Sequence, residues 1–419
     1  MQAKFVRFAL DRIPVSLIID DSTVLVNLNY FWMRDRNPVD RQNRRWEDVP
    51  VVHPESFTRE FAEFCLEAGV RGKFSVVPCP AALGRIDEGL PLFSRQQQES
   101  WLAMCREVIQ PAFDITPEMI THTFVVDPQT LQPVEPRIWE QMEWETLPTD
   151  QEELVFDYIA TACRILDNVG LTPEGVTSPG GFGGRTLEFY AKVAGEATRS
   201  VTGDPAPYFF KRVKDEPITR AGQVEVPVWY PDPAARTATG EIIASTGDWT
   251  GSWTGYGEVN ADKYLTADLQ GGRVRELIEA GEPVIFCSHW QGFYGMHNED
   301  RRGFRALQTV VARLRELDPR GERTRWRKCS EITRYACATQ MANLSVAVDE
   351  VRLHLPLVVP EVTLSLTDVR PGILAVDGRP LRQVSHRRDF VSGTWLSEGD
   401  QTLVAFDPAG PQVTLTVQA

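Results

Sequence analysis

The sequence predicts an α/β fold: a distorted seven-stranded (β/α) barrel over residues 1–340, followed by a small all-β sandwich over residues 343–419. Up to about residue 330, short apolar runs alternate with longer segments of helical period, as in parallel strands joined by crossover helices. After about residue 340 the runs are short, alternate between apolar and polar residues, and are separated by turn residues such as Asp377 and Gly378. We therefore expect a large domain that carries the functional site and a smaller accessory domain.

Seven apolar runs are candidates for the strands of the barrel. They cover residues 15–19, 73–77, 120–126, 175–178, 199–202, 242–245 and 284–287. Between them, apolar residues recur at helical spacing over residues 57–68 and 154–166, which predicts two helices with a buried face. Residues 221–262 are rich in Gly, Pro, Trp and Tyr and predict irregular strands and loops over a binding face.

The composition excludes several classes of partner. A net charge of −14 disfavours nucleic acid, because a phosphate backbone is bound by clustered Lys and Arg. No window approaches ~18 uninterrupted apolar residues, and the N-terminus has no apolar stretch of signal-peptide length, so we expect a cytoplasmic protein that binds no membrane. The seven cysteines never form a CxxC pair, which predicts small buried side chains rather than disulfides or a cysteine-based zinc site. The expected partner is a small-molecule or oligosaccharide substrate, and homo-oligomerisation stays open.

Two adjacent carboxylates, Asp20 and Asp21, follow directly on the first apolar strand in LIIDDST. Adjacent carboxylates repel one another, so a cation or a proton at this place would relieve the repulsion. In a barrel, the carboxyl ends of the strands are where sites are built. The alternative interpretation is that one carboxylate caps the next turn and the other is solvated.

Two histidines follow other predicted strands. His122 lies among apolar neighbours in MITHTFVVD, with Asp127 five residues later, and His289 follows the most apolar strand in PVIFCSHWQGFYG. Each histidine alone is compatible with a structural role, but strand ends converge in a barrel, so these residues predict a joint site with the Asp pair. The other histidines are left outside the predicted site: His53, His297, His354 and His386.

Two further segments supply candidate substrate-binding residues. TSPGGFGG contains Gly180 and Gly181, which predict either a tight turn or main-chain N–H groups that approach a ligand. STGDWTGSWTGYG places Asp248 beside two tryptophans, a combination suited to stacking on sugar faces. The candidate aromatic residues for substrate binding are Trp249, Trp253, Trp290 and Tyr294.

Together these motifs resemble those of the polysaccharide deacetylase family, within the superfamily of barrel glycoside hydrolases and deacetylases. LIIDDST resembles the first motif, which implies Asp20 as general base and Asp21 as ligand of a divalent metal, with zinc as the expected ion. THTFVVD resembles the second motif and implies His122 as a metal ligand. GDW resembles part of the fourth motif, which implies an orienting role for Asp248, and FCSHW resembles the fifth, which implies His289 as general acid.

The chain departs from the family pattern in two places. The second motif of the family has another histidine four residues after the first, and that residue is Val126 here, so we expect Asp127 or His53 to replace it. TSPGGFGG also lacks the arginine that opens the third motif.

Three functions remain open from the sequence. The first is a metal-dependent hydrolase that removes an acyl group from a carbohydrate or a related small molecule. The second is a glycoside hydrolase on the same barrel, with Asp248 and either Asp20 or Asp21 as its two carboxylates. The third is a carbohydrate-binding or scaffold protein without catalysis, which the missing histidine favours.

Overall fold

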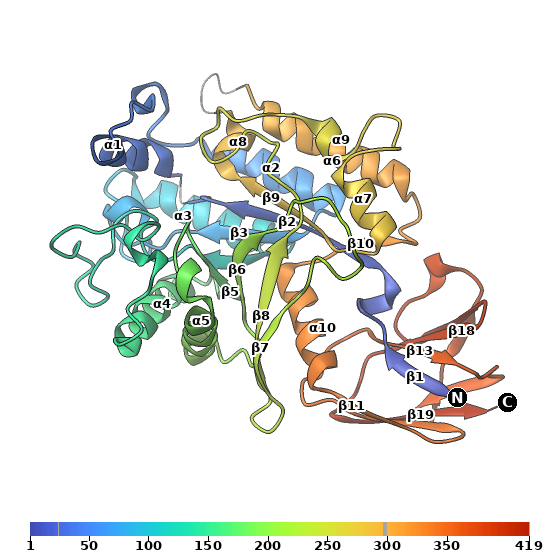
Figure 1. Ribbon diagram of the computed structural model, residues 1–419. Helices are drawn as coiled ribbons and strands as arrows, with labels where there is room; N and C mark the ends of the chain where they lie inside the picture. The colour runs from blue at the N-terminus through green and yellow to red at the C-terminus, as the bar shows by residue number, and fades with distance from the viewer. Residues whose placement is uncertain (24, 296–299, 419) are drawn as a thin grey trace.

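The structure is a computed structural model that describes residues 1–23, 25–295 and 300–418, and it shows a mixed α/β protein with a β-rich C-terminal part. His297 lies outside the described residues. Helices lie on both sides of the strands in the α/β part, and both chain ends lie in the β-rich part (Figure 1).

The strands of the α/β part form two sheets. The first is parallel and contains β2 (Ile13–Asp20), β3 (Gly72–Val76), β4 (Phe113–Pro117), β9 (Val284–His289) and β10 (Thr324–Trp326). The second contains the parallel strands β5 (Gly175–Thr177), β6 (Tyr208–Val213) and β8 (Thr237–Ala244), with β7 (Val228–Asp232) antiparallel to β8. Asp20 of β2 lies opposite His289 of β9, so these two side chains end neighbouring strands.

Main-chain hydrogen bonds join the two sheets at two places. The amide of Glu174 donates to the carbonyl of Ile115 at 3.1 Å, which links β5 to β4, and the amide of Ser245 donates to the carbonyl of Ile285 at 2.8 Å, which links the end of β8 to β9. In the described chain no continuous ladder closes the strands into a barrel. The predicted barrel is therefore observed as two sheets with two junctions.

Two of the predicted strands are wrong. Residues 120–126 form a loop, and the strand is β4, which ends before it. The loop resembles a strand in sequence because Ile120, Val125 and Val126 are buried, but Val126 forms only an isolated bridge with Pro133. Residues 199–202 are the last turn of helix α5, which continues to Gly203 in the left-handed region at φ 73°, and the strand β6 follows the turn.

The helices of the α/β part cover the sheets. The two helices expected around residues 57–68 and 154–166 are confirmed as α2 (Glu55–Ala68) and α4 (Glu152–Asp167). The others are α1 (Leu28–Asp40), α3 (Arg95–Met104), α5 (Leu187–Thr202), α6 (Ala261–Tyr264), α7 (Arg273–Ala280), α8 (Trp290–Tyr294), α9 (Arg302–Leu317) and α10 (Cys329–Met341). The segment 221–262 is irregular as expected, with β7, β8 and connecting loops.

The C-terminal part is a pair of mainly antiparallel sheets with an apolar core between them. One sheet has the order β1-β13-β18-β17-β16 and the other β11-β12-β19-β14-β15. Side chains such as Leu353, Leu364 and Leu415 are buried in this core, and Tyr335 of α10 packs on it from the α/β part. The strands are β1 (Gln2–Phe5), β11 (Asn343–Val346), β12 (Glu350–His354), β13 (Val362–Thr367), β14 (Ile373–Val376), β15 (Arg379–Pro380), β16 (Arg382–Val384), β17 (Thr394–Glu398), β18 (Gln401–Phe406) and β19 (Gln412–Gln418).

The first strand of the chain corrects the predicted domain boundary. Residues 1–340 were assigned to one domain, but β1 pairs antiparallel with β13, with Gln2 opposite Thr367 and Phe5 opposite Leu364. The short apolar run before residue 6 is thus part of the C-terminal sheet pair. The remainder of the division stays a prediction.

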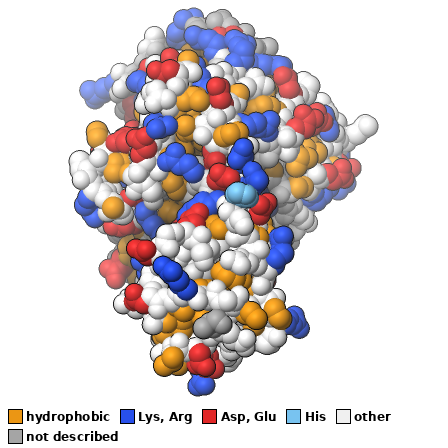
Figure 2. Space-filling view, turned by 90° about the vertical axis from the view of Figure 1, so that its right-hand side faces the viewer, with side chains coloured by type: hydrophobic (Ala, Val, Ile, Leu, Met, Phe, Trp, Pro, Cys, Tyr) orange, Lys and Arg blue, Asp and Glu red, His pale blue; other side chains and the backbone are white. Residues whose placement is uncertain are grey.

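Three bulk properties can be checked on the structure. All seven cysteines are free and buried, as expected. Among the described residues no helix has the length and apolar character that crossing a membrane needs. Figure 2 shows basic and acidic side chains mixed over one face of the molecule rather than gathered into a patch of one sign.

Helix α2 offers a direct test of the core. Phe61 is 1% exposed and packs against Trp290, Phe293 and Phe304, whereas Leu66 on the same helix is 47% exposed. We predict that Phe61→Ala lowers the free energy of unfolding by about 3–5 kcal/mol, because it leaves a cavity. The matched variant Leu66→Ala should change it by less than about 0.5 kcal/mol. Urea denaturation checks both, and equal effects would contradict this packing.

Candidate functional site

A cavity of about 260 Å³ opens at the carboxyl ends of β2, β4, β5 and β9. Parallel strands place the residues that follow them at one edge, which is where sites are built in such folds. The cavity is lined by Asp20, Asp21, Asn29, Trp32, Glu118, His122, Gln141, Ser178, Gly180, Trp253 and His289.

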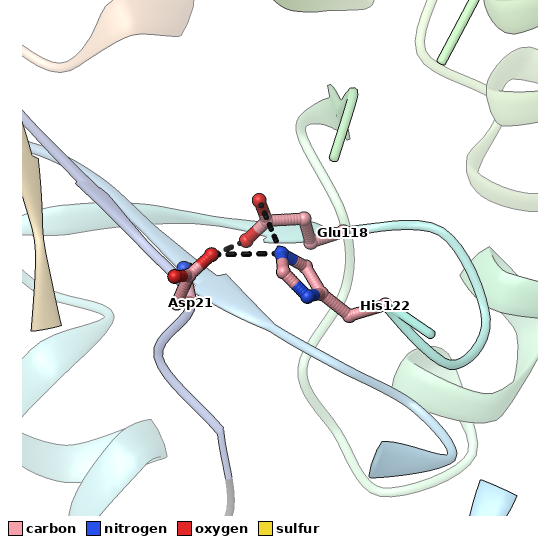
Figure 3. Close-up of side chains that lie close together, drawn as sticks. All are labelled: Asp21, Glu118 and His122. Atoms are coloured by element: carbon pink, nitrogen blue, oxygen red, sulfur yellow. Dashed lines mark hydrogen bonds and ion pairs between the residues drawn. The ribbon is translucent and has the colours of Figure 1, made fainter. Parts of the chain in front are cut away.

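Asp21, Glu118 and His122 form a buried triad in this cavity. His122 Nε2 lies 2.7 Å from Asp21 Oδ1 and 3.3 Å from Glu118 Oε1, and the three donor atoms all lie within 4.8 Å of one another. The amide of Asp21 donates to Glu118 Oε2 at 2.8 Å, so the two carboxylates are fixed relative to each other. Figure 3 shows the three side chains pointing toward a common space.

A second carboxylate holds the loop that carries His122. The carboxylate of Glu140 accepts the main-chain amides of Ile120, Thr121 and His122 at 3.2, 2.9 and 2.7 Å, and it also accepts the hydroxyl of Tyr158. These bonds stabilise a left-handed backbone at His122, where φ is 63°. Burial raises the pKa of Glu140 to about 7, opposed by the hydrogen bonds it accepts.

The charge state of the triad is set by its two carboxylates. Burial alone would lower the pKa of His122, but the charges of Asp21 and Glu118 raise it well above its usual range. A cation at this position is therefore strongly favoured, and the imidazolium supplies it in the bare protein. Loss of the proton from Nε2 would leave one nitrogen and two carboxylate oxygens facing one point, a donor set that suits a divalent ion such as zinc.

Gln141 lies behind His122, on the side away from the carboxylates. Its amide nitrogen lies 3.1 Å from His122 Nδ1 and donates to the His122 carbonyl at 3.2 Å. A protonated or metal-bound imidazole carries hydrogen on Nδ1, so this contact is then a hydrogen bond only with the amide of Gln141 turned to present its oxygen. In that orientation Gln141 keeps Nε2 directed at the triad.

Asp20 sits beside the triad and forms an ion pair with the fully buried Lys73 of β3. Lys73 Nζ also donates to Ser75 Oγ and Thr177 Oγ1, both at 2.7 Å. Burial raises the pKa of Asp20, and the positive charge of Lys73 opposes that rise. Lys73 thus supplies a cation next to Asp20 from a strand for which the sequence indicated only packing.

His289 and Asp248 form a hydrogen-bonded pair in this site. His289 Nδ1 lies 2.7 Å from Asp248 Oδ2, and Asp248 Oδ1 accepts the amide and hydroxyl of Thr250 at 2.9 and 2.6 Å. Burial lowers the pKa of His289, but the bond to Asp248 and the charges of Asp21 and Asp20 outweigh it and raise the pKa to about 9. With Nδ1 engaged, Nε2 is the nitrogen left for a ligand.

Several predicted site residues lie elsewhere. Asp127 is exposed and caps a turn by accepting the amides of Gln129 and Thr130, so it does not replace the missing histidine. His53 is buried against the rings of Trp290 and Tyr294, outside the cavity lining, and burial lowers its pKa to about 3. It does not join the triad either.

Of the four aromatic residues predicted to bind substrate, Trp253 lines the cavity and the other three do not. Trp290 is 2% exposed and Tyr294 is buried, and both pack on Phe57 as part of the core, because α8 turns them away from the cavity. Trp249 packs on Tyr264.

The two predicted glycines lie in different surroundings. Gly180 lines the cavity, with its backbone in the left-handed region at φ 44°. The amide of Gly181 instead donates to the carbonyl of Gln141 at 3.1 Å.

The sequence interpretation missed Glu118, the third member of the triad. The signal was present, since Glu118 precedes His122 by four residues, the spacing that was sought after His122 and not before it. The strand was placed at residues 120–126, so Glu118 did not appear at a strand end. Asn29, Trp32, Gln141 and Ser178 were also missed, and the sequence carries no pattern that marks them.

The His289–Asp248 pair makes stability depend on pH. A histidine whose pKa rises from 6.5 to about 9 on folding contributes stability that is complete below pH 6.5 and is lost as the pH rises to 9. Over that window we predict that the wild type loses roughly 1–3 kcal/mol more unfolding free energy than Asp248→Asn does. Urea denaturation at both pH values measures this, and parallel losses would contradict the assigned pair.

Comparisons with known proteins give little further information. No family model matches the chain, and a search of curated proteins finds no significant match. Among solved structures, the chain is similar to a crystal structure of an alpha-amylase from Anoxybacillus, described as a new glycosyl hydrolase subclass. The TM-score is 0.35 with 9% identity, over 98% of this chain and 99% of the amylase. We therefore base the function on the geometry of the cavity.

Proposed function

We propose that the chain is a metal-dependent hydrolase that removes an acyl group from a carbohydrate or a related small molecule. The observation that carries the proposal is that one cavity contains the triad of Asp21, Glu118 and His122 together with Asp20 and the His289–Asp248 pair. The first group suits a cation, and the others supply a base and an acid. These are the parts that acyl hydrolysis needs.

Asp21, Glu118 and His122 would hold the metal, with Gln141 orienting the imidazole. A bound divalent ion supplies Lewis acidity and lowers the pKa of a bound water. The donor set has two carboxylates and one imidazole, so its formal charge of −2 balances a divalent cation once His122 is neutral. The residues present therefore fit the ion.

Asp20 is the base in this proposal. Its carboxylate lines the cavity next to Asp21, where it can accept a proton from an attacking water. Lys73 holds Asp20 in place through the buried ion pair. Burial raises the pKa of Asp20, which makes the carboxylate a stronger base than an exposed one.

His289 is the acid. Its pKa of about 9 keeps the imidazole protonated at neutral pH, so a proton is available for the leaving amine or alcohol. Asp248 holds Nδ1, which leaves Nε2 to donate that proton. The pair thus fixes both the charge and the orientation of the ring.

An aromatic wall completes the cavity. The rings of Trp32 and Trp253 meet edge to face at 5.1 Å between centroids, and the side chain of Asn29 donates to the carbonyl of Trp253. Tryptophan rings offer an apolar face with a polar edge, which suits a sugar ring. This wall supports a carbohydrate or another compact polar molecule as substrate.

A glycoside hydrolase is the second candidate, and one observation favours it. The carboxylates of Asp20, Asp21 and Glu118 all face the same cavity, and glycoside hydrolysis uses a pair of carboxylates. Asp248 does not take part in such a pair, because its carboxylate is bound by His289 and Thr250. In this alternative the pair would come from Asp20, Asp21 and Glu118.

Metal content tests the triad. We predict that protein purified without chelator binds near one equivalent of zinc or another divalent ion, and that Glu118→Ala and Asp21→Ala each lose it, because two donors hold an ion poorly. Elemental analysis measures the content. Asp127→Ala is the matched control, since that exposed carboxylate should change nothing. Metal that persists in Glu118→Ala, or disappears in Asp127→Ala, would contradict the triad.

The released product separates the two hydrolase candidates. With acetylated oligosaccharides we predict release of acetate, whereas a glycoside hydrolase would release new reducing ends. The rate should fall as the pH rises through about 9, because His289 loses its proton, and His289→Gln should lower kcat by about 10²–10⁴-fold. Release of reducing ends without acetate would favour the glycoside hydrolase over the acyl hydrolase. If neither acetate nor reducing ends are released, a binding protein is favoured.

A further inference from the structure

A second cavity of about 300 Å³ lies at the opposite end of β2, between the α/β part and the β-rich part. It is bordered by residues around the start of β2, the start of α10 and the segment before β13. Since β2 runs from Ile13 to Asp20 at about 3.3 Å per residue, this cavity is roughly 23 Å from the candidate active site. It is therefore a separate site.

The walls of this interdomain cavity are mostly apolar and also carry charged side chains. Apolar side chains come from both parts of the chain, including Phe8, Ile332 and Val359. The charged residues of the lining are Arg12, Arg327, Glu331, Arg334 and Glu361. Such a cavity suits a ligand with an apolar body and one polar end.

Arg12 is the unusual residue of this cavity. It is 7% exposed, and its guanidinium donates to the main-chain carbonyl of Arg387. In the described part of the chain no carboxylate lies within ion-pairing distance of Arg12. Buried charges in proteins are usually paired, because an unpaired one loses its hydration without compensation. Arg12 thus has donors available and a charge to be balanced.

The carboxylates nearby are already engaged. Glu361 pairs with both Arg325, at 3.1 Å, and Arg327. Asp318 accepts three main-chain amides and the hydroxyl of Thr324. Burial, followed by the charges of Arg325 and Arg327, lowers the pKa of Arg12, which shows that its surroundings disfavour another cation. Of the three arginines that line the cavity among the described residues, Arg327 pairs with Glu361 and Arg334 pairs with Glu174 and Asp204, so Arg12 is the one without a carboxylate partner.

We propose that the interdomain cavity is a binding site for a small organic monocarboxylate with an apolar body, held by Arg12. The carboxylate of the ligand pairs with the guanidinium of Arg12, which is planar and donates two parallel hydrogen bonds. The apolar body packs between Phe8, Ile332 and Val359. One guanidinium without a carboxylate partner matches a monoanion better than a phosphate dianion. This ligand would contact both parts of the chain.

Binding of octanoate tests the proposal, with calorimetry on the full chain. We predict saturable binding with one site per chain, and weaker binding of 1-octanol, which lacks the charge, and of inorganic phosphate, which lacks the apolar body. Arg12→Met should raise the Kd by at least about tenfold, because it removes the charge-assisted hydrogen bonds. The exposed Arg388, which lies 3.8 Å from Asp389, provides the matched control Arg388→Met with unchanged binding.

A second variant keeps the test decisive if Arg12→Met fails to fold. Ala9→Phe fills the cavity and keeps Arg12, so it should also abolish octanoate binding while circular dichroism stays native. Asp21→Ala, in the other cavity, should bind octanoate normally, which separates this inference from the proposed hydrolase. No octanoate binding, equal binding of phosphate, or binding unaffected by both Arg12→Met and Ala9→Phe would overturn the proposal.

Discussion

Buried negative charge at the carboxyl ends of β2 and β4 is the constraint around which the α/β part is arranged. Asp20, Asp21 and Glu118 are all buried there. Without nearby cations, buried carboxylates this close together would be protonated or would turn toward solvent. Two cations from other segments face these three carboxylates: Lys73 from β3 pairs with Asp20, and His122 lies between Asp21 and Glu118. A divalent ion would take over the role of the His122 proton.

Two residues of the site have left-handed backbone conformations, and neighbouring groups stabilise them. Asp21 and His122 both adopt left-handed φ angles, at 56° and 63°, which non-glycine residues rarely adopt. The carboxylate of Glu140 accepts the main-chain amides of Thr121 and His122, and it also accepts the hydroxyl of Tyr158. Strain that is held in this way is typical of sites whose geometry has to be fixed before a ligand arrives.

A site residue can be predicted from the sequence where it directly follows an apolar strand, and not where contacts with distant segments place it. Asp20, Asp21 and His289 directly end apolar strands, so their convergence could be predicted. The only sequence signal for Glu118 is its spacing of four residues before His122, because the buried loop after β4 is as apolar as a strand and hides the true strand end. Trp290 follows an apolar strand directly, but it lies in the core and not in the cavity lining. Only its packing against Phe57 and Phe61 of α2 shows this, and no local sequence pattern indicates that packing. Lys73, which pairs with Asp20, and β13, which pairs with β1, come from distant segments of the chain. No local sequence pattern indicates such pairing.

The central claim is that Asp21, Glu118 and His122 together hold a divalent cation. A crystal structure of the protein incubated with zinc, with anomalous diffraction recorded at the zinc edge, tests it most directly. We expect one strong anomalous peak bounded by the two carboxylates and His122 Nε2, at about 2.0–2.2 Å from each donor atom. An absent peak there, with the imidazole still bound to both carboxylates, or a peak elsewhere in the chain, would contradict it.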